Sequence, residues 1–381
     1  MKDIVLVMTW DHPNLVTQNF STIISASFES YNQRVVQISV SKPINEQFVG
    51  IDFSSISAIF CIGHEPLAIR INNSELYNAI DCPFYVYVLD TPIYNLRNPA
   101  LVKFLNDSTT NKRLHVLFAE QSYIDLYSRY ELNHNKPNIS FMPFAGFPNI
   151  NKKVPKLDRA VVVGGLGTQL STFSDTLIET INNSNPYDAD ESELENLNNT
   201  INSESFNGNV TRAIIDNFNL PASELVDTDF LTFACSLDSF IKHRNRIKAI
   251  DSLKGFPTDF YGPGWDSMYK DVPEFNFMGE ISHTDISRII NQYKIAINFD
   301  PNWENGVHDR VFTTLGCGSS LITNKNDFLS NVDGKIYTYS INNPNLKELA
   351  ETACAEYTDS HNTVLLNHSW YERVTKLIQS T

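Results

Sequence analysis

Short apolar runs alternate with amphipathic stretches over the first 150 residues. Runs of strand length with few polar interruptions lie at 3–10, 34–41, 58–63, 84–90, 115–120 and 139–146. Between them, the apolar residues of 14–32 and of 122–131 recur at helical spacing. Continuous apolar strands separated by helices predict a parallel sheet covered on both faces. We therefore expect an α/β, Rossmann-like domain over residues 1–150.

A polar segment at 147–158 contains two prolines and three lysines, and it predicts an interdomain linker. A second alternating unit follows. Its predicted strands are 159–163, 258–265, 275–282, 294–300, 319–324 and 335–340, and its predicted helices are 239–255, 283–293, 310–318 and 368–380. We expect a second Rossmann-like domain over 151–365, facing the first across a cleft, and a terminal helix over 366–381. The acidic, Asn-rich stretch 191–209 indicates a loop or a weakly packed helical insert, and segment 183–209 has no derivable role.

Composition narrows the possible functions. The net charge of -15 disfavours general binding of duplex nucleic acid, although a local basic cleft would be hidden in this total. The one dense basic run, 242–248, is expected to be a solvated helix face. The five cysteines are widely spaced and no apolar run approaches 18 residues, which favours a cytoplasmic protein without a transmembrane helix. No cofactor is predicted, and no His, Asp or Glu spacing predicts a metal site.

The stretch GVHDRVFTTLGCG, which begins at Gly306, is the strongest chemical signal. Glycine lets the backbone approach a ligand closely. His308 and Arg310 stand at the start of the predicted helix, where free N–H groups and the helix dipole bind phosphate. Arg310 would add a bidentate, charge-assisted contact. The alternative is an ordinary strand-to-helix connection with a surface histidine and arginine.

Two glycine-rich turns follow predicted strands. VVVGGLGTQL contains Gly165 but not the G-x-G-x-x-G spacing of dinucleotide sites, so a ligand-binding turn and a structural turn both remain open. In FYGPGW, Tyr261 or Trp265 would stack on a nucleobase. The alternative is a pair of core aromatic residues beside a turn, and we favour it for Trp265.

Acidic residues and histidines follow the predicted strands of the first domain. Asp11 and His12 come directly after the first strand, where either would serve as a general base for an acceptor hydroxyl. The alternative is a capping cluster at the start of the next helix. His64 and Asp90 follow two further strands, and each would contact substrate or cap a turn.

The order of the motifs in the second half resembles the CgeB-like glycosyltransferases. The resemblance rests on RNRIKAIDSL, FYGPGW, FNFMGEIS, IINQYKIAINFD, GVHDRVFTTLGCGSSLIT and HSWYERVTKLI, and in the first half on YVLDTPIYN, FAEQSYIDLYSRYE and ISFMPFAG. The matching positions are Tyr261, Gly262, Gly264, Trp265, Gly279, Asn298, His308, Arg310, Phe312, Gly318, His368, Trp370 and Arg373. The ordered match covers about two thirds of the chain.

This resemblance implies a GT-B fold whose C-terminal helix crosses back to the N-terminal domain. It implies a metal-independent transferase that moves a sugar from a UDP-, GDP- or TDP-sugar to the hydroxyl of a glycan, a protein or a modified nucleobase. The expected catalytic residues are Asp11, His12, His308 and Arg310. The expected donor-binding residues are Tyr261, Gly262, Gly264, Asn298, Gly306, Val307, Thr313 and Thr314. The expected acceptor-side residues are Asp90, His64 and Gly165.

One departure from the wider family pattern separates the candidate functions. Retaining GT-B enzymes commonly carry an E-x7-E pair around this loop, whereas Asn305 and Thr313 occupy those positions here. A threonine hydroxyl binds a ribose less strongly than a carboxylate does. A degenerate transferase that binds a nucleotide sugar or a glycan without chemistry is therefore the main alternative. A third possibility is a sugar-nucleotide epimerase, which would convert the donor without an acceptor.

Overall fold

The computed structural model describes residues 3–129, 135–147, 154–166, 179, 181, 185–187, 191–300, 302–358 and 367–379. The chain divides into two compact units. Unit 1 contains Met1–Phe144, Ala222–Leu231 and Trp370–Thr381, and unit 2 contains Ala145–Pro221 and Thr232–Ser369. Half of the predicted linker, residues 148–153, and the last four residues of the glycine-rich stretch VVVGGLGTQL lie outside the described residues.

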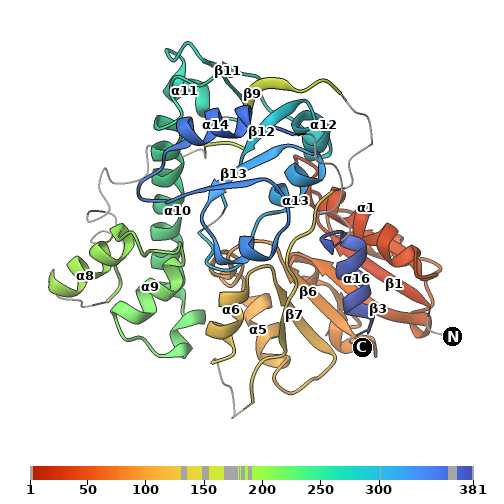
Figure 1. The fold of residues 1–381 in the computed structure, drawn as a ribbon. Helices are drawn as coiled ribbons and strands as arrows, with labels where there is room; N and C mark the ends of the chain where they lie inside the picture. Colours follow the sequence, from red (N-terminus) through yellow and green to blue (C-terminus); the bar gives the residue numbers. More distant parts are fainter. Residues whose placement is uncertain are drawn as a thin grey trace. The chain divides into compact units, whose positions relative to one another are not determined.

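Unit 1 is built on a six-stranded parallel sheet of order β2-β1-β3-β6-β7-β8 (Figure 1). Its strands are β1 (Ile4–Thr9), β2 (Arg34–Ser39), β3 (Ile56–Ile62), β6 (Phe84–Val88), β7 (Leu114–Phe118) and β8 (Ile139–Phe141). Its helices include α1 (Val16–Glu29), α2 (Ile44–Gln47), α3 (Leu76–Ala79), α4 (Pro92–Asn95), α5 (Pro99–Asp107) and α6 (Gln121–Tyr127). A small hairpin of β4 (Arg70–Ile71) and β5 (Ser74–Glu75) precedes α3.

Unit 2 contains a second six-stranded parallel sheet, of order β11-β10-β9-β12-β13-β14. Its strands are β9 (Leu157–Val163), β10 (Thr258–Tyr261), β11 (Phe275–Phe277), β12 (Tyr293–Ile297), β13 (Ser320–Asn324) and β14 (Ile336–Tyr339). Its helices include α8 (Glu191–Asn202), α9 (Val210–Asn217), α10 (Thr228–Asp251), α11 (Trp265–Tyr269), α12 (Ile286–Ile290), α13 (Asp309–Gly316) and α14 (Leu346–Ala355). The first turn of α10 is counted with unit 1.

Side chains of β9 alternate between two cores, as expected of a strand buried on both faces. Ala160 and Val162 pack into a core shared with α10, α11 and α14. Val161 and Val163 pack into a core with α12 and Cys317, at the end of α13. The continuous apolar run that predicted this strand thus reflects burial on both sides.

The terminal helix α16 (Trp370–Gln379) packs against α1 within unit 1 (Figure 1). Trp370 is almost completely buried, with its ring 5.3 Å from Phe20 and 6.4 Å from Phe144, centroid to centroid. Arg373 donates hydrogen bonds to the carbonyls of Pro143 (3.1 Å) and Phe144 (3.2 Å). The tryptophan and arginine of the HSWYER motif therefore anchor this helix rather than line a site.

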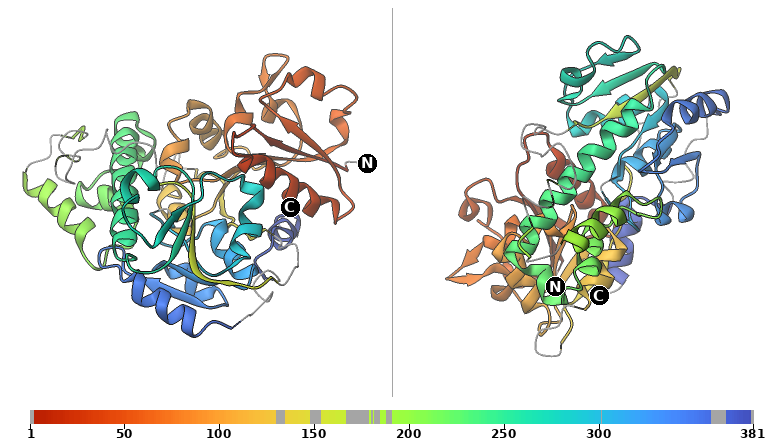
Figure 2. Two further views of the ribbon diagram at one scale, coloured as in Figure 1. Left: turned by 90° about the horizontal axis from the view of Figure 1, so that it is seen from above. Right: turned by 90° about the vertical axis from the view of Figure 1, so that its left-hand side faces the viewer.

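Several elements differ from the sequence predictions. Helix α10 begins at Thr228, eleven residues before its predicted start at 239, because its first half is apolar on more than one side and buried accordingly. The Asn-rich insert is helical at α8, and α8 and α9 lie beside α10 in the views of Figures 1 and 2. Helices α5, α9 and α14 were not predicted. No helix in the described part of the chain is long and apolar enough to cross a bilayer.

Candidate functional site

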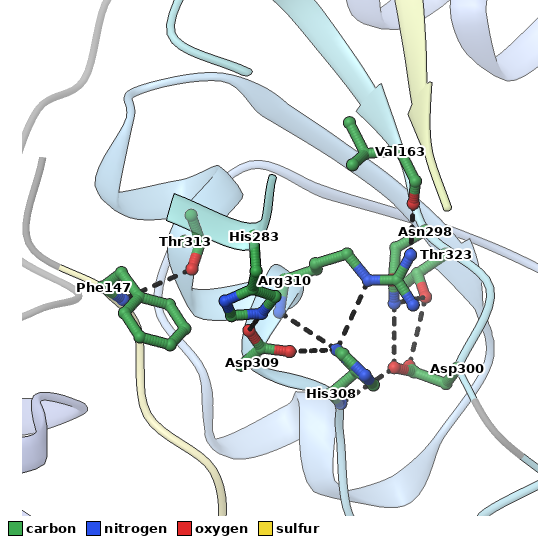
Figure 3. A network of polar contacts seen from close by, with 10 residues as sticks. All are labelled: Phe147, Val163, His283, Asn298, Asp300, His308, Asp309, Arg310, Thr313 and Thr323. Atoms are coloured by element: carbon green, nitrogen blue, oxygen red, sulfur yellow. Dashed lines mark hydrogen bonds and ion pairs between the residues drawn. The ribbon is translucent and has the colours of Figure 1, made fainter. Parts of the chain in front are cut away.

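The strand order of each sheet reverses at one place, where ligands of open α/β sheets bind beyond the carboxyl ends of the strands. In unit 2 the reversal lies between β9 and β12, because the chain first builds outward through β10 and β11 and then returns to the other side of β9. Helix α13 begins twelve residues after β12 ends. Its N-terminus and the ends of β9 and β12 share one polar network (Figure 3).

His308 caps helix α13. Its Nδ1 accepts from the backbone N–H of Arg310 (3.5 Å) and from Arg310 Nε (3.3 Å). The ring also contacts Asp309, whose carboxylate lies 3.4 Å from His283 Nε2 on its other side. Burial alone would raise the pKa of Asp309, but His308 and His283 outweigh burial and hold that pKa well below its usual range. The first turn of α13 therefore buries a carboxylate between two imidazoles.

Asp300 ties the end of β12 to this helix. Its Oδ1 accepts from the backbone N–H of His308 (3.0 Å) and from Asn298 Nδ2 (2.8 Å), and its Oδ2 accepts from Thr323 Oγ1 (3.2 Å). Burial raises the pKa of Asp300 despite these bonds. Sequence reasoning selected Asn298 but missed Asp300, although a charged residue directly after a buried strand was a usable signal.

Arg310 reaches back over the end of β9, where its Nη1 donates to the Val163 carbonyl (Figure 3). Gly164 follows Val163. A Cβ on Gly164 would lie 2.5 Å from Arg310 Nη1, so a larger residue there would displace the guanidinium. Burial lowers the pKa of the guanidinium, which nevertheless stays charged in proteins. Among the described residues, no protein group bonds its Nη2.

The two glycine-rich turns pack against each other. A Cβ on Gly262 would lie 2.6–2.8 Å from the backbone of Gly164 and Gly165, so only glycine fits there. The Gly165 carbonyl accepts from Arg246 Nη1 at 2.9 Å. Gly165 was expected on the acceptor side, but it belongs to the same edge as Arg310.

Both aromatic residues of FYGPGW belong to the core. The ring of Tyr261 packs with β9 and β12, and its hydroxyl lies 3.3 Å from that of Tyr293. Trp265 is buried, and its Nε1 donates to the Gly164 carbonyl at 2.7 Å. The prediction that Tyr261 stacks on a nucleobase is therefore corrected, and the favoured alternative holds for Trp265. Gly264, with φ 91°, only starts α11.

The basic run on α10 is half-buried rather than fully solvated, which corrects the sequence interpretation. Lys242 forms an ion pair with buried Asp238 (2.8 Å), and Arg246 reaches the turn after β9. A small pocket lies between this helix and the carboxyl ends of β12, β13 and β14. Its lining includes Lys242, Asn245, Arg246, Asp300, Asn302, Asn324 and Tyr339. The sequence analysis assigned these basic residues to a solvated face because their partners are distant in the chain.

The other expected donor-binding residues are mostly buried in the loop and helix. Val307 and Thr314 are almost completely buried, and the Gly306 carbonyl accepts from Asn326 Nδ2 at 2.7 Å. Thr313 is 1% exposed, and its hydroxyl accepts from the backbone N–H of Phe147 at 3.3 Å. The side chain of Thr313 thus faces protein backbone, and this does not favour a ribose contact.

The insert braces the loop before α13. Glu304 Oε2 accepts from Asn209 Nδ2 (3.2 Å), and its Oε1 lies 3.5 Å from Arg212 Nη1. Gly208 allows this approach, since a Cβ there would lie 3.2 Å from the Asn302 backbone. The acidic segment without a derivable role thus leads into a contact with the candidate loop.

The corresponding edge in unit 1 lies at the ends of β1 and β3. Asp11 Oδ1 accepts from Ser39 Oγ at 2.8 Å, and His12 Nδ1 accepts from the backbone N–H of Asn14 at 3.1 Å. The alternative that these residues cap the next helix is not supported, because α1 starts after Leu15 and no side chain caps its N-terminus. Leu15 has φ 57°, a strained conformation of the kind found at functional sites.

His64 and Glu65 follow β3, and Asp90 follows β6. His64 Nδ1 lies 3.0 Å from Asn95 Oδ1, and its Nε2 lies 4.0 Å from Glu65 Oε1. Asp90 is exposed. Within the described residues, no group of three or more His, Cys, Asp or Glu is placed to hold a metal ion.

Comparison with known proteins identifies the class of fold. Residues 242–379 match a family described as "Glycosyl transferase-like". A structure of T4 phage beta-glucosyltransferase is 11% identical with a TM-score of 0.51, covering 98% of each chain. A second, of T4 phage BGT in complex with UDP and Mn2+, is 10% identical with a TM-score of 0.50, covering 98% of this chain and 99% of that one. No curated protein sequence matches the chain. The two-sheet fold is therefore the GT-B fold of these structural neighbours, and the C-terminal segment 242–379 is similar to glycosyl transferase-like proteins.

Proposed function

We propose that unit 2 binds a nucleoside diphosphate sugar and that unit 1 binds the acceptor that carries the hydroxyl. One observation supports this proposal most directly. Arg310, His308 and the N-terminus of α13 lie together at the strand-order reversal in the sheet of unit 2. A diphosphate there would receive backbone N–H groups, the helix dipole and the second Nη of Arg310. UDP is the favoured nucleotide because the T4 phage relative has been crystallised with UDP.

The same contacts provide the chemistry of the leaving group. As the sugar–phosphate bond breaks, negative charge grows on the diphosphate, and preorganised positive groups stabilise that charge. Protein groups alone would supply this stabilisation, so we propose metal-independent transfer. The ordered motifs support the CgeB-like subtype, and the five free cysteines support a cytoplasmic location.

A non-catalytic nucleotide-sugar-binding protein is the second candidate. The observation that favours it is the pair of missing carboxylates at Asn305 and Thr313, together with the burial of Thr313. Such a protein would bind the nucleotide as the transferase does. It would release no sugar to water or to any acceptor.

Thermal denaturation with UDP, GDP and TDP tests the donor site. A ligand that binds only the folded state raises stability by RT ln(1 + [L]/Kd). We expect one nucleotide to raise the melting temperature of the wild type, and the rise to disappear in Arg310→Ala. Arg288→Ala is the matched control, because Arg288 is exposed and pairs only with Asp285 on the same turn of helix among the described residues.

Turnover separates the two candidate functions. With a UDP-sugar, Arg310→Ala is expected to lower kcat/KM by about 100-fold or more, as loss of a transition-state charge contact does. Unchanged turnover in Arg310→Ala would contradict the assignment. Binding without turnover across donors and acceptors would favour the second candidate.

A further inference from the structure

The side chains of Trp10 and Glu65 lie beside Gly63 at the strand-order reversal of unit 1, between β1 and β3. A Cβ on Gly63 would lie 2.5 Å from Glu65 Oε2 and 3.7 Å from Trp10 Nε1. Glycine therefore allows the Glu65 carboxylate to fold back beside the residue that follows β1. Glu65 Oε2 is buried and has no hydrogen-bond partner among the described residues. A buried carboxylate oxygen without a partner is costly, and at such an edge a ligand hydroxyl would satisfy it.

His64 has a defined tautomer in this arrangement. Its Nδ1 is 3.0 Å from Asn95 Oδ1, and an amide oxygen only accepts, so Nδ1 carries the proton. The lone pair of the neutral ring is then on Nε2. The 4.0 Å separation between Nε2 and Glu65 Oε1 is too long for a hydrogen bond. Nε2 therefore remains able to accept a proton from a hydroxyl placed between the two side chains.

His12, the other histidine of this edge, has the opposite tautomer. Its Nδ1 accepts from the backbone N–H of Asn14, so in the neutral ring the proton is on Nε2. One oxygen of Asp11 accepts from Ser39 Oγ. His12 Nε2, which carries the proton, is thus less suited to the role of a base than Nε2 of His64.

We propose that His64 is the general base of the transfer, oriented by Asn95 and balanced by Glu65. This inference rests on the proposed function. The proton of the acceptor hydroxyl moves to Nε2 of His64 as the hydroxyl oxygen forms a bond to the anomeric carbon of the donor. The bond from that carbon to the diphosphate oxygen breaks, and the nucleoside diphosphate leaves with the electron pair. The imidazolium then returns its proton to solvent, and the Glu65 carboxylate stabilises the ring while it is charged.

The test follows the release of UDP by the full chain from UDP-glucose, UDP-galactose and UDP-N-acetylglucosamine, with water or added sugars as acceptor. His64→Ala is expected to lower release by about 100-fold or more, the usual contribution of a general base. The melting-temperature rise caused by UDP should be unchanged, because the donor contacts lie in unit 2. Added imidazole should restore part of the lost rate, which a merely structural role would not allow. Should His64→Ala fold poorly, His64→Asn supplies a second variant that also lacks a basic nitrogen.

Two further variants sharpen the assignment. Glu65→Gln is expected to lower the rate by about 10-fold without imidazole rescue, because it removes the charge beside the ring but leaves the base. His12→Ala is expected to lose less activity than His64→Ala, again without rescue. Rescue in His12→Ala but not in His64→Ala would overturn the proposal in favour of His12. UDP binding without UDP release by the wild type would also overturn it while leaving the donor site intact, whereas no binding of UDP, GDP or TDP would instead refute the proposed function.

Discussion

The carboxyl edges of the two sheets have the same topological position but different construction. In unit 2, two turns touch through backbone at Gly262 and Gly164, and the carboxylates of Asp300 and Asp309 are buried among partners. In unit 1, the side chains of His64 and Glu65 are 18% and 32% exposed, and a Cβ on Gly63 would first meet the end of the Glu65 side chain. The first edge is preorganised around fixed charges, as a diphosphate requires. The second retains room for a side chain to move, as expected where the acceptor is bound.

Alanine at the glycines of the two edges should show the largest difference. Gly262→Ala places a Cβ against backbone at φ 137°, so strain and overpacking together should cost about 3 kcal/mol or more. Gly63→Ala displaces only the Glu65 carboxylate and should cost about 1–2 kcal/mol from its φ of 84°. Urea denaturation measures both values.

Gly279→Ala is the control for this comparison, since Gly279 has φ 79° and a Cβ added there would meet nothing within 4 Å. It isolates the cost of the backbone conformation, about 1–2 kcal/mol. Equal losses for Gly262→Ala and Gly279→Ala would show that the contact between the two turns is unimportant.

The buried carboxylates of unit 2 should respond to pH with opposite signs. Folding lowers the pKa of Asp309, so as the pH falls the carboxyl takes up a proton in the unfolded chain before it does so in the folded protein. Asp309 therefore stabilises the fold above about pH 4, and this contribution is lost as the pH falls further. The pKa of Asp300 is raised, so its ionised form costs stability at neutral pH, and the cost is relieved as the pH falls through that raised value.

Unfolding free energies of Asp309→Asn and Asp300→Asn at pH 7 and about pH 3 test this contrast. Asp309→Asn should lose about 1–3 kcal/mol at pH 7 and less at about pH 3, which lies below the pKa of the unfolded carboxyl. Asp300→Asn should be within about 1 kcal/mol of wild type at pH 7, since an asparagine oxygen still accepts from His308 and Asn298, and should compare less favourably at the lower pH. The same pH trend in both variants would refute the opposite shifts.

The contact of Arg212 with Glu304, in the loop before α13, should have the smallest effect. Arg212→Ala removes a half-exposed ion pair with Glu304 and should cost only about 0.5–1 kcal/mol of stability. If the brace positions the loop before α13, KM for the UDP-sugar should rise a few-fold with kcat little changed. Lys254→Ala is the matched control, because its ion pair with Asp251 is exposed and lies at the end of α10 away from the loop. A similar rise in KM for both variants would exclude a specific role for the insert.

The alternation of apolar runs determined the α/β class and most strands, because parallel strands buried on both faces have a pattern of their own. It placed β1, β6, β12 and β13 within a few residues, and the run at 310–318 placed α13. It also selected Arg310, His308 and His64, since their positions just after strands or at a helix start are local properties. Helix α14 and the first half of α10 were not predicted, because their helical periodicity is weak and tertiary packing stabilises them.

The tertiary structure alone decided the partners of these residues. Burial of Tyr261 against β9, the paired imidazoles around Asp309 and the contact of Arg246 with Gly165 join positions separated by up to about one hundred residues, which no local pattern records. The tautomer of His64 likewise depends on Asn95, which lies 31 residues further along the chain, after β6. Sequence determined which groups stand at the strand ends, whereas folding decided which of them are bound to one another and which remain able to meet a substrate.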